Sequence, residues 1–211
     1  MVPRILTFAP APSLISEAVT KFGGQPCWLS GSQWPISRSL GKPMRFICQI
    51  ALPPDLRAGG QQMAYLFMID EAEAVDGSWE PDAGENALIL QPGPFVPIVS
   101  TRPLKIGPTL QARRESTTGF LRRPQVTFEN VELAVSEREL EPTDSEPRLH
   151  SRIGGQPGWL QNDETPDGDW RFLAQIDSVT TSFAVDFGDG GVGYLFVRAD
   201  GLEARFLWQS L

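Results

Sequence analysis

The sequence Gly-Gly-Gln-Pro-Cys-Trp-Leu at residues 23–29 returns as Gly-Gly-Gln-Pro-Gly-Trp-Leu at residues 154–160, at an offset of 131 (154 − 23). Two shorter blocks follow in the same order: residues 45–50 match 171–176, and residues 65–67 match 194–196. Ordered blocks at near-constant offsets indicate an internal duplication. We therefore predict a single domain over residues 1–211, with half one at 13–100, a connection at 101–150 and half two at 151–211.

Composition places the chain among globular proteins, with 41% hydrophobic and 21% charged residues. Twenty glycines and 19 prolines favour many short strands joined by turns. One short helix is expected after Ser13, because Leu14, Ile15, Ala18 and Val19 recur at helical spacing before a glycine. The predicted class is α+β and β-rich, with two pseudo-equivalent halves of mainly antiparallel strands and few short helices.

The apolar runs give the expected strands. Each half offers a pair that could form a hairpin, at residues 44–52 and 64–69 in half one and at 170–176 and 192–197 in half two. Residues 126–135 alternate between apolar and polar, with a change of phase at Asn130 that suggests a bulge. The remaining expected strands are at 87–91, 95–99 and 204–208.

Charge and cysteine usage exclude several classes of protein. The net charge of −8 disfavours binding to nucleic acid or to an anionic membrane, which both require a cationic surface. No apolar run reaches the roughly 18 residues of a membrane span, and the N-terminus lacks a signal-peptide pattern, so a cytoplasmic location is expected. Cys27 and Cys48 correspond to Gly158 and Ala174 in the second copy, which indicates a need for small residues rather than thiol chemistry.

The sequence offers few groups for catalysis. His150 is the only histidine, so a histidine-rich zinc site is excluded and any nucleophile–histidine pair would have to use it. The acidic loops, such as the one with Asp186 and Asp189, do not have EF-hand spacing. We predict no catalytic, cofactor or metal residues, although a hydrolase that uses these acidic loops is a third hypothesis behind two binding functions.

The repeated block has a structural and a functional interpretation. Its glycines permit a turn, its proline stiffens the chain, and its Trp-Leu pair can fill a core. Alternatively, both copies line one pseudo-symmetric ligand cleft through Gln25, Trp28, Gln156 and Trp159.

Two more glutamines, Gln49 and Gln175, lie inside apolar strands. An unpaired buried amide costs about 1–3 kcal/mol, so we expect each to bond the backbone of its own repeat's turn.

These blocks resemble the YwqG-like family, a bacterial domain of unknown function. The resemblance rests on Lys-Phe-Gly-Gly-Gln-Pro at residues 21–26 and on residues 41–50, 84–93 and 188–194. Between residues 34 and 41 the family often has additional proline and cysteine, where this chain has Ser-Arg-Ser-Leu. The resemblance implies a compact, duplicated, β-rich α+β fold without assigned catalytic residues. Members often sit near polymorphic toxin genes, which implies an immunity role.

The leading hypothesis is therefore a non-enzymatic, cytoplasmic immunity protein that binds and neutralises a cognate toxin. An acidic protein would attract a basic partner and raise the association rate. The alternative is a small-ligand-binding protein that uses the cleft between the halves. The sequence leaves open the oligomeric state and whether calcium binds. The expected contact surface is the loop that carries Trp79, Glu80, Asp82 and Glu85.

Overall fold

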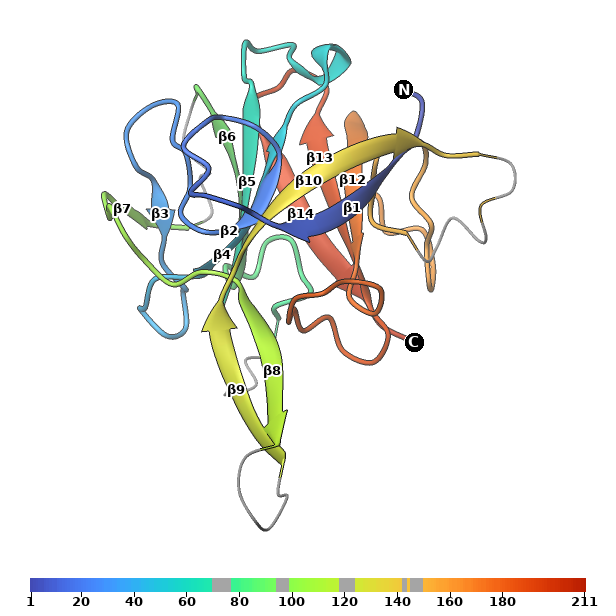
Figure 1. Ribbon diagram of the computed structural model, residues 1–211. Coiled ribbons are helices and arrows are strands. Elements are labelled where there is room, and N and C mark those ends of the chain that lie inside the picture. Colours follow the sequence, from blue (N-terminus) through green and yellow to red (C-terminus); the bar gives the residue numbers. More distant parts are fainter. Residues whose placement is uncertain (70–76, 94–98, 118–123, 142–143, 145–149) are drawn as a thin grey trace.

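The computed structural model describes residues 1–69, 77–93, 99–117, 124–141, 144 and 150–211 (Figure 1). Fourteen strands account for almost all regular structure in these residues, and one 3-10 turn, η1 (Pro54–Leu56), is the remaining element. The strands are β1 (Arg4–Pro10), β2 (Lys21–Gly23), β3 (Trp34–Pro35), β4 (Arg45–Ala51), β5 (Met63–Met68), β6 (Asn86–Gln91), β7 (Thr101–Arg102), β8 (Gln111–Thr117), β9 (Pro124–Asn130), β10 (Glu132–Glu139), β11 (Arg152–Ile153), β12 (Trp170–Asp177), β13 (Val192–Arg198) and β14 (Ala204–Gln209).

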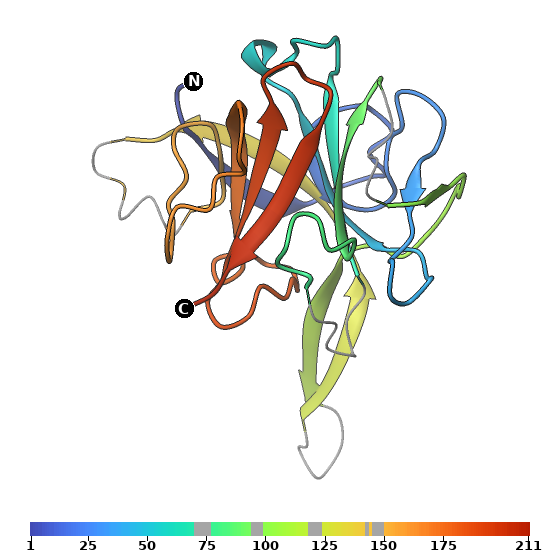
Figure 2. The same cartoon turned by 180° about the vertical axis from the view of Figure 1, so that it is seen from behind.

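Ten of these strands form one antiparallel sheet that curls into a nearly closed barrel (Figures 1 and 2). Its order is β14-β13-β12-β11-β1-β10-β2-β4-β5-β6, and the two end strands β14 and β6 lie beside each other. The loop of residues 77–85 spans this seam, where the amide of Trp208 donates to the carbonyl of Trp79 over 3.4 Å. The barrel interior is a single apolar cluster to which both halves contribute.

The α+β prediction was wrong, because the described chain contains no α-helix and is almost all β. The expected helix after Ser13 does not form, and its apolar positions do not make a buried stripe, since Leu14 is 87% exposed. Backbone carbonyls that would accept hydrogen bonds within a helix instead accept them from side chains. Ile15 O accepts from Lys21 Nζ, and Glu17 O and Val19 O accept from Gln49 Nε2.

The duplication is visible in the strand order of the sheet, in which the two halves are arranged symmetrically about the centre. Outward from the centre, β10-β2-β4-β5-β6 mirrors β1-β11-β12-β13-β14. The pairing of β4 with β5 is irregular between Phe46 and Cys48, and the pairing of β12 with β13 is irregular between Phe172 and Ala174, which are the corresponding positions. The two central strands are exchanged: β1 precedes half one but pairs with β11, and β10 precedes half two but pairs with β2.

Most expected strands are confirmed as β4, β5, β6, β12, β13 and β14. The run at 126–135 is divided between β9 and β10, and the break at Val131 lies beside the predicted change of phase at Asn130. Residues 95–98 of the strand expected at 95–99 lie outside the described residues. Strands β8 and β9 form a separate two-stranded sheet and project from the barrel as a hairpin (Figure 1), and Gln111 at the start of β8 also bridges to Ala184.

Candidate functional site

A buried glutamine fixes each copy of the repeated block to its own half. Gln49 Oε1 accepts a hydrogen bond from Cys27 N over 2.8 Å, and its amide nitrogen donates to two backbone carbonyls of the preceding segment. In half two, Gln175 Oε1 accepts from Gly158 N and Gln175 Nε2 donates to His150 O, both over 3.0 Å. The prediction that both amides bond backbone at the repeat's own turn is confirmed.

A tyrosine adds a second clamp to each block. The hydroxyl of Tyr65 donates to Cys27 O over 2.8 Å, and that of Tyr194 donates to Gly158 O over 2.9 Å. Burial raises the pKa of the Tyr65 hydroxyl above its usual range, so it remains a proton donor at neutral pH.

A further glutamine from the end strand of each half adds a third clamp. Gln91 Oε1 accepts from the backbone N–H groups of residues 29 and 30, and Gln209 Oε1 accepts from those of residues 160 and 161. These interactions explain the repeated block as a structural element.

The two predicted cleft tryptophans belong to separate clusters. Trp28 packs on Tyr65, with ring centroids 4.8 Å apart, in a cluster built on half one. Trp159 packs on Tyr194 at 4.4 Å in a different cluster on half two. Each tryptophan therefore sits on the outside of its own half, and the arrangement gives no support to one stacking surface shared by both.

The two predicted cleft glutamines also differ in their surroundings. Gln25 Oε1 accepts from Gly107 N over 3.0 Å and Gln25 Nε2 donates to Gly107 O over 3.1 Å, so its side chain anchors a neighbouring loop. The side chain of Gln156 is exposed, while its backbone carbonyl accepts from Arg152.

The outer faces of the two halves are covered differently, and this difference defines the candidate site. In half one, Met44 and Phe46 are both 0% exposed, and Trp34 in β3 covers them as its indole N–H donates to Met44 O over 2.7 Å. The corresponding residues of half two, Trp170 and Phe172, are partly exposed. The described part of half two has no strand between β11 and β12 that could take the place of β3. We call Trp159, Trp170 and Phe172 the aromatic face.

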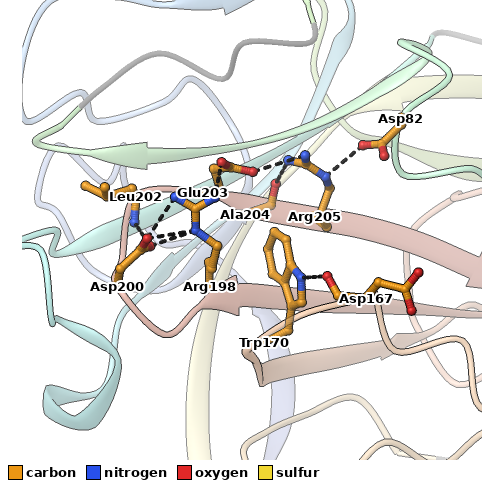
Figure 3. Close-up of polar contacts among 9 residues, drawn as sticks. All are labelled: Asp82, Asp167, Trp170, Arg198, Asp200, Leu202, Glu203, Ala204 and Arg205. Atoms are coloured by element: carbon orange, nitrogen blue, oxygen red, sulfur yellow. Dashed lines mark hydrogen bonds and ion pairs between the residues drawn. The ribbon is translucent and has the colours of Figure 1, made fainter.

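Arg205 joins the aromatic face to the loop across the seam of the barrel (Figure 3). Its guanidinium lies over the ring of Trp170, 5.3 Å from the centroid. Arg205 Nε contacts Asp82 Oδ1 over 2.7 Å, and Nη2 contacts Glu203 Oε2 over 3.1 Å. Arg198 extends the network by pairing with Glu203. Two carboxylates thus hold this cation in place, and the aromatic face and the seam loop form one continuous surface.

The expected contact loop lies at this seam, but not all of its predicted residues are accessible. Trp79 is 44% exposed and makes an edge contact with Trp208 at 6.2 Å, while Glu80 and Asp82 are exposed. Glu85 is the exception and does not belong to a contact surface, because it is only 3% exposed.

The carboxylate of Glu85 has a structural role in half one. Its two oxygens accept from Ser37 Oγ over 2.5 Å and from Ser39 N over 2.8 Å.

Both thiols are free, and we expect them to differ in reactivity. Cys48 is completely buried and its burial raises the pKa of the thiol, so little thiolate forms at neutral pH. Cys27 is half-buried and donates to Ile15 O over 3.1 Å. A thiol-specific chromogenic disulfide should therefore label at most one thiol in the native protein and two after unfolding. Rapid native labelling of Cys48, located by peptide mass spectrometry, would contradict this packing.

In the part of the chain that the structure describes, no group of three or more His, Cys, Asp and Glu side chains is arranged to hold a metal ion. The described residues also contain no helix that could span a membrane.

Sequence reasoning missed Trp170 and Arg205, although the duplication contained a usable signal. Trp170 stands where half one has Met44, and the strand pairing places Arg205 where half one has Ala87. A large aromatic ring and a cation thus replace two residues that are buried in half one. Comparing the halves position by position would have marked both residues as departures from the shared core.

Comparison with known proteins gave one match. The family model described as a domain of unknown function, DUF1963, matches residues 20–207 and so covers most of the chain, including both copies of the repeated block. No curated protein and no solved structure matched.

Proposed function

Because the chain belongs to the family described as a domain of unknown function, DUF1963, we propose a function from its surface: a non-enzymatic protein that binds a protein partner. The most concrete form of this proposal is a cytoplasmic immunity protein that neutralises a cognate bacterial toxin. The finer resemblance to YwqG-like proteins, whose genes often sit near toxin genes, supports that form.

The observation that carries the proposal is an exposed aromatic side chain on a fixed loop. The ring of Trp79 is 44% exposed, yet its backbone carbonyl is bonded by Trp208 N and its ring packs against the Trp208 indole. Asp82 on the same loop is bound by Arg205. Tryptophan is enriched among the residues that dominate binding energy, and a surface already held in place loses less entropy on association.

Charge indicates the kind of partner. The exposed carboxylates of Glu80 and Asp82 lie close to Trp79 in the sequence, and the whole chain carries a net charge of −8. A basic protein would be attracted toward this surface, and the effect would fall as salt increases because exposed charges are screened. The proposal therefore includes an association rate that decreases between low and moderate salt.

A pull-down from the native organism tests this proposal. Tagged wild-type protein should capture a basic protein at a stoichiometric level, and Trp79→Ala should weaken that complex by about 2 kcal/mol, or roughly 30-fold in Kd, as is typical for a central interface aromatic residue. The matched control is Leu14→Ala, which also shortens an exposed apolar side chain but lies outside the loop of residues 77–85. Equal capture by the wild type and the Trp79 variant would remove this loop from the interface, and absence of any captured protein would contradict the proposed function.

A further inference from the structure

We infer that the aromatic face of half two receives an aromatic side chain from a cationic segment of the partner protein, in the position that Trp34 occupies on half one. This inference rests on the proposed protein-binding function and specifies the chemistry of the partner. It follows from comparing two copies of the same structural unit. In half one, Trp34 packs over the outer aromatic cluster and serves as its cover, whereas the described part of half two has no equivalent strand.

Half one shows how the covered unit is built. Trp34 is 0% exposed and makes edge contacts with Phe67 at 5.3 Å and with Trp28 at 6.4 Å. It lies in the short extended strand β3, which pairs with β7 outside the barrel (Figure 1). Val99 and Leu104 from the segment around β7 join the same cluster. One aromatic residue on an extended segment is thus the centre of the cover.

The platform beneath that cover is repeated in half two. Trp28 stacks on Phe67 with an interplanar angle of 11° and centroids 5.9 Å apart, and Trp159 stacks on Phe196 at 17° and 6.0 Å. A second phenylalanine flanks each stack: the Phe46 ring lies 5.3 Å from that of Phe67, and the Phe172 ring lies 5.7 Å from that of Phe196. The two platforms therefore present similar aromatic surfaces to whatever packs against them.

The cover itself is not repeated. Thirteen residues, 31–43, separate Ser30 from Met44 and carry Trp34. In half two only residues 162–169, within the loop at 161–169, separate the corresponding Gln161 and Trp170. That loop is polar and mostly exposed. Trp170 and Phe172 consequently retain exposed ring surface that a partner can bury, and burying apolar area releases about 25 cal/mol per Å².

The rim of the aromatic face selects a cationic segment. Four exposed carboxylates lie on the loop at 161–169, and Trp170 Nε1 donates to a backbone carbonyl of the same loop over 3.0 Å, so the loop stays beside the face. Two guanidinium groups contact the rings of this face. Arg205 is matched by Asp82 and Glu203, and Arg152, which lies 5.9 Å from the Phe172 ring centroid, is buried. A lysine or arginine beside the partner's aromatic residue would therefore be attracted by the exposed carboxylates of the loop. The four carboxylates are Asp163, Glu164, Asp167 and Asp169.

The test is fluorescence anisotropy with the full chain and a labelled nine-residue peptide, Gly-Ser-Lys-Trp-Pro-Lys-Ser-Lys-Gly. Two control peptides replace its tryptophan by alanine or its three lysines by glutamate. Two protein variants carry the same change of charge in different places: Glu164→Lys at the rim of the aromatic face and Glu17→Lys on half one, where Glu17 is exposed. Circular dichroism spectra confirm that both variants remain folded.

The inference expects the lysine–tryptophan peptide to bind at least tenfold more tightly than either control peptide. Glu164→Lys should weaken its binding several-fold more than Glu17→Lys does. Equal binding of the tryptophan and alanine peptides, equal effects of the two charge variants, or no binding of any peptide would each overturn the inference. The proposed function would survive these results if the pull-down still captured a partner in a Trp79-dependent manner, so the two failures are distinguishable.

Discussion

Replacing Gly23 with alanine should remove most of the stability of the protein. Gly23 has a φ of +67°, and an added Cβ would collide with the carbonyl oxygen of Val131. That oxygen also accepts from Gly24 N over 2.8 Å, so it cannot move without breaking a bond between half one and the central strands. The left-handed conformation alone costs about 1–2 kcal/mol for a non-glycine residue, and with the collision we expect at least about 4 kcal/mol. Urea unfolding followed by tryptophan fluorescence measures the loss.

Gly41 supplies a matched control. Its φ is +62°, close to that of Gly23, but an added Cβ would have no atom within 4 Å. Gly41→Ala should therefore cost only the conformational term of about 1–2 kcal/mol. Similar losses for the two variants would mean that the close approach of Val131 to Gly23 is not a constraint on the fold.

Replacing Gln49 with leucine should give the second largest effect. Gln49 is completely buried, and the change would remove the bonds that its amide makes to Cys27 N and Val19 O, and one of the two bonds that Glu17 O accepts. Each unsatisfied buried group costs about 1–3 kcal/mol, although the segment before β2 can re-expose some of them to water. We expect the free energy of unfolding to fall by about 3 kcal/mol, visible as a lower urea midpoint.

The exposed Gln156 provides the control for that experiment. Gln156→Leu makes the same chemical change at a side chain in contact with solvent, and it should alter the free energy of unfolding by less than about 0.5 kcal/mol. Gln175→Leu should reproduce the loss seen for Gln49→Leu, because its amide holds the second block in the same way. An unchanged midpoint for Gln49→Leu would contradict the clamp.

Sequence predicted those features in which the local pattern of apolar and polar residues matches their burial in the structure. The strands at 44–52 and 192–197 are apolar at most positions because they separate the barrel interior from an outer cluster, and the structure buries residues on both of their faces. Gln49 and Gln175 stood out because a polar amide in such a run requires a partner. The duplication added evidence, since each half repeated the same pattern.

The features that could not be predicted depend on contacts between distant segments. The spacing of Leu14 and Val19 is helical, but no described element buries them, so tertiary bonds to the carbonyls of this segment decide its conformation. Strand β11 has only two residues, too few to show a pattern. The binding of Asp82 to Arg205 crosses the seam between strands at opposite ends of the sheet, which no local signal encodes.

The exchange of β1 and β10 has a consequence for how the polypeptide reaches its native state. Thr7 and Ser136, which meet at the centre of the sheet, are 129 positions apart in sequence. Strand β1 thus leaves the ribosome long before either of its neighbours, β10 and β11, exists. Bringing such distant segments together costs loop-closure entropy before their contacts stabilise the chain. We therefore expect slow, all-or-none folding rather than independent folding of the two halves. Gene duplication here has doubled the unit without yielding two autonomous modules.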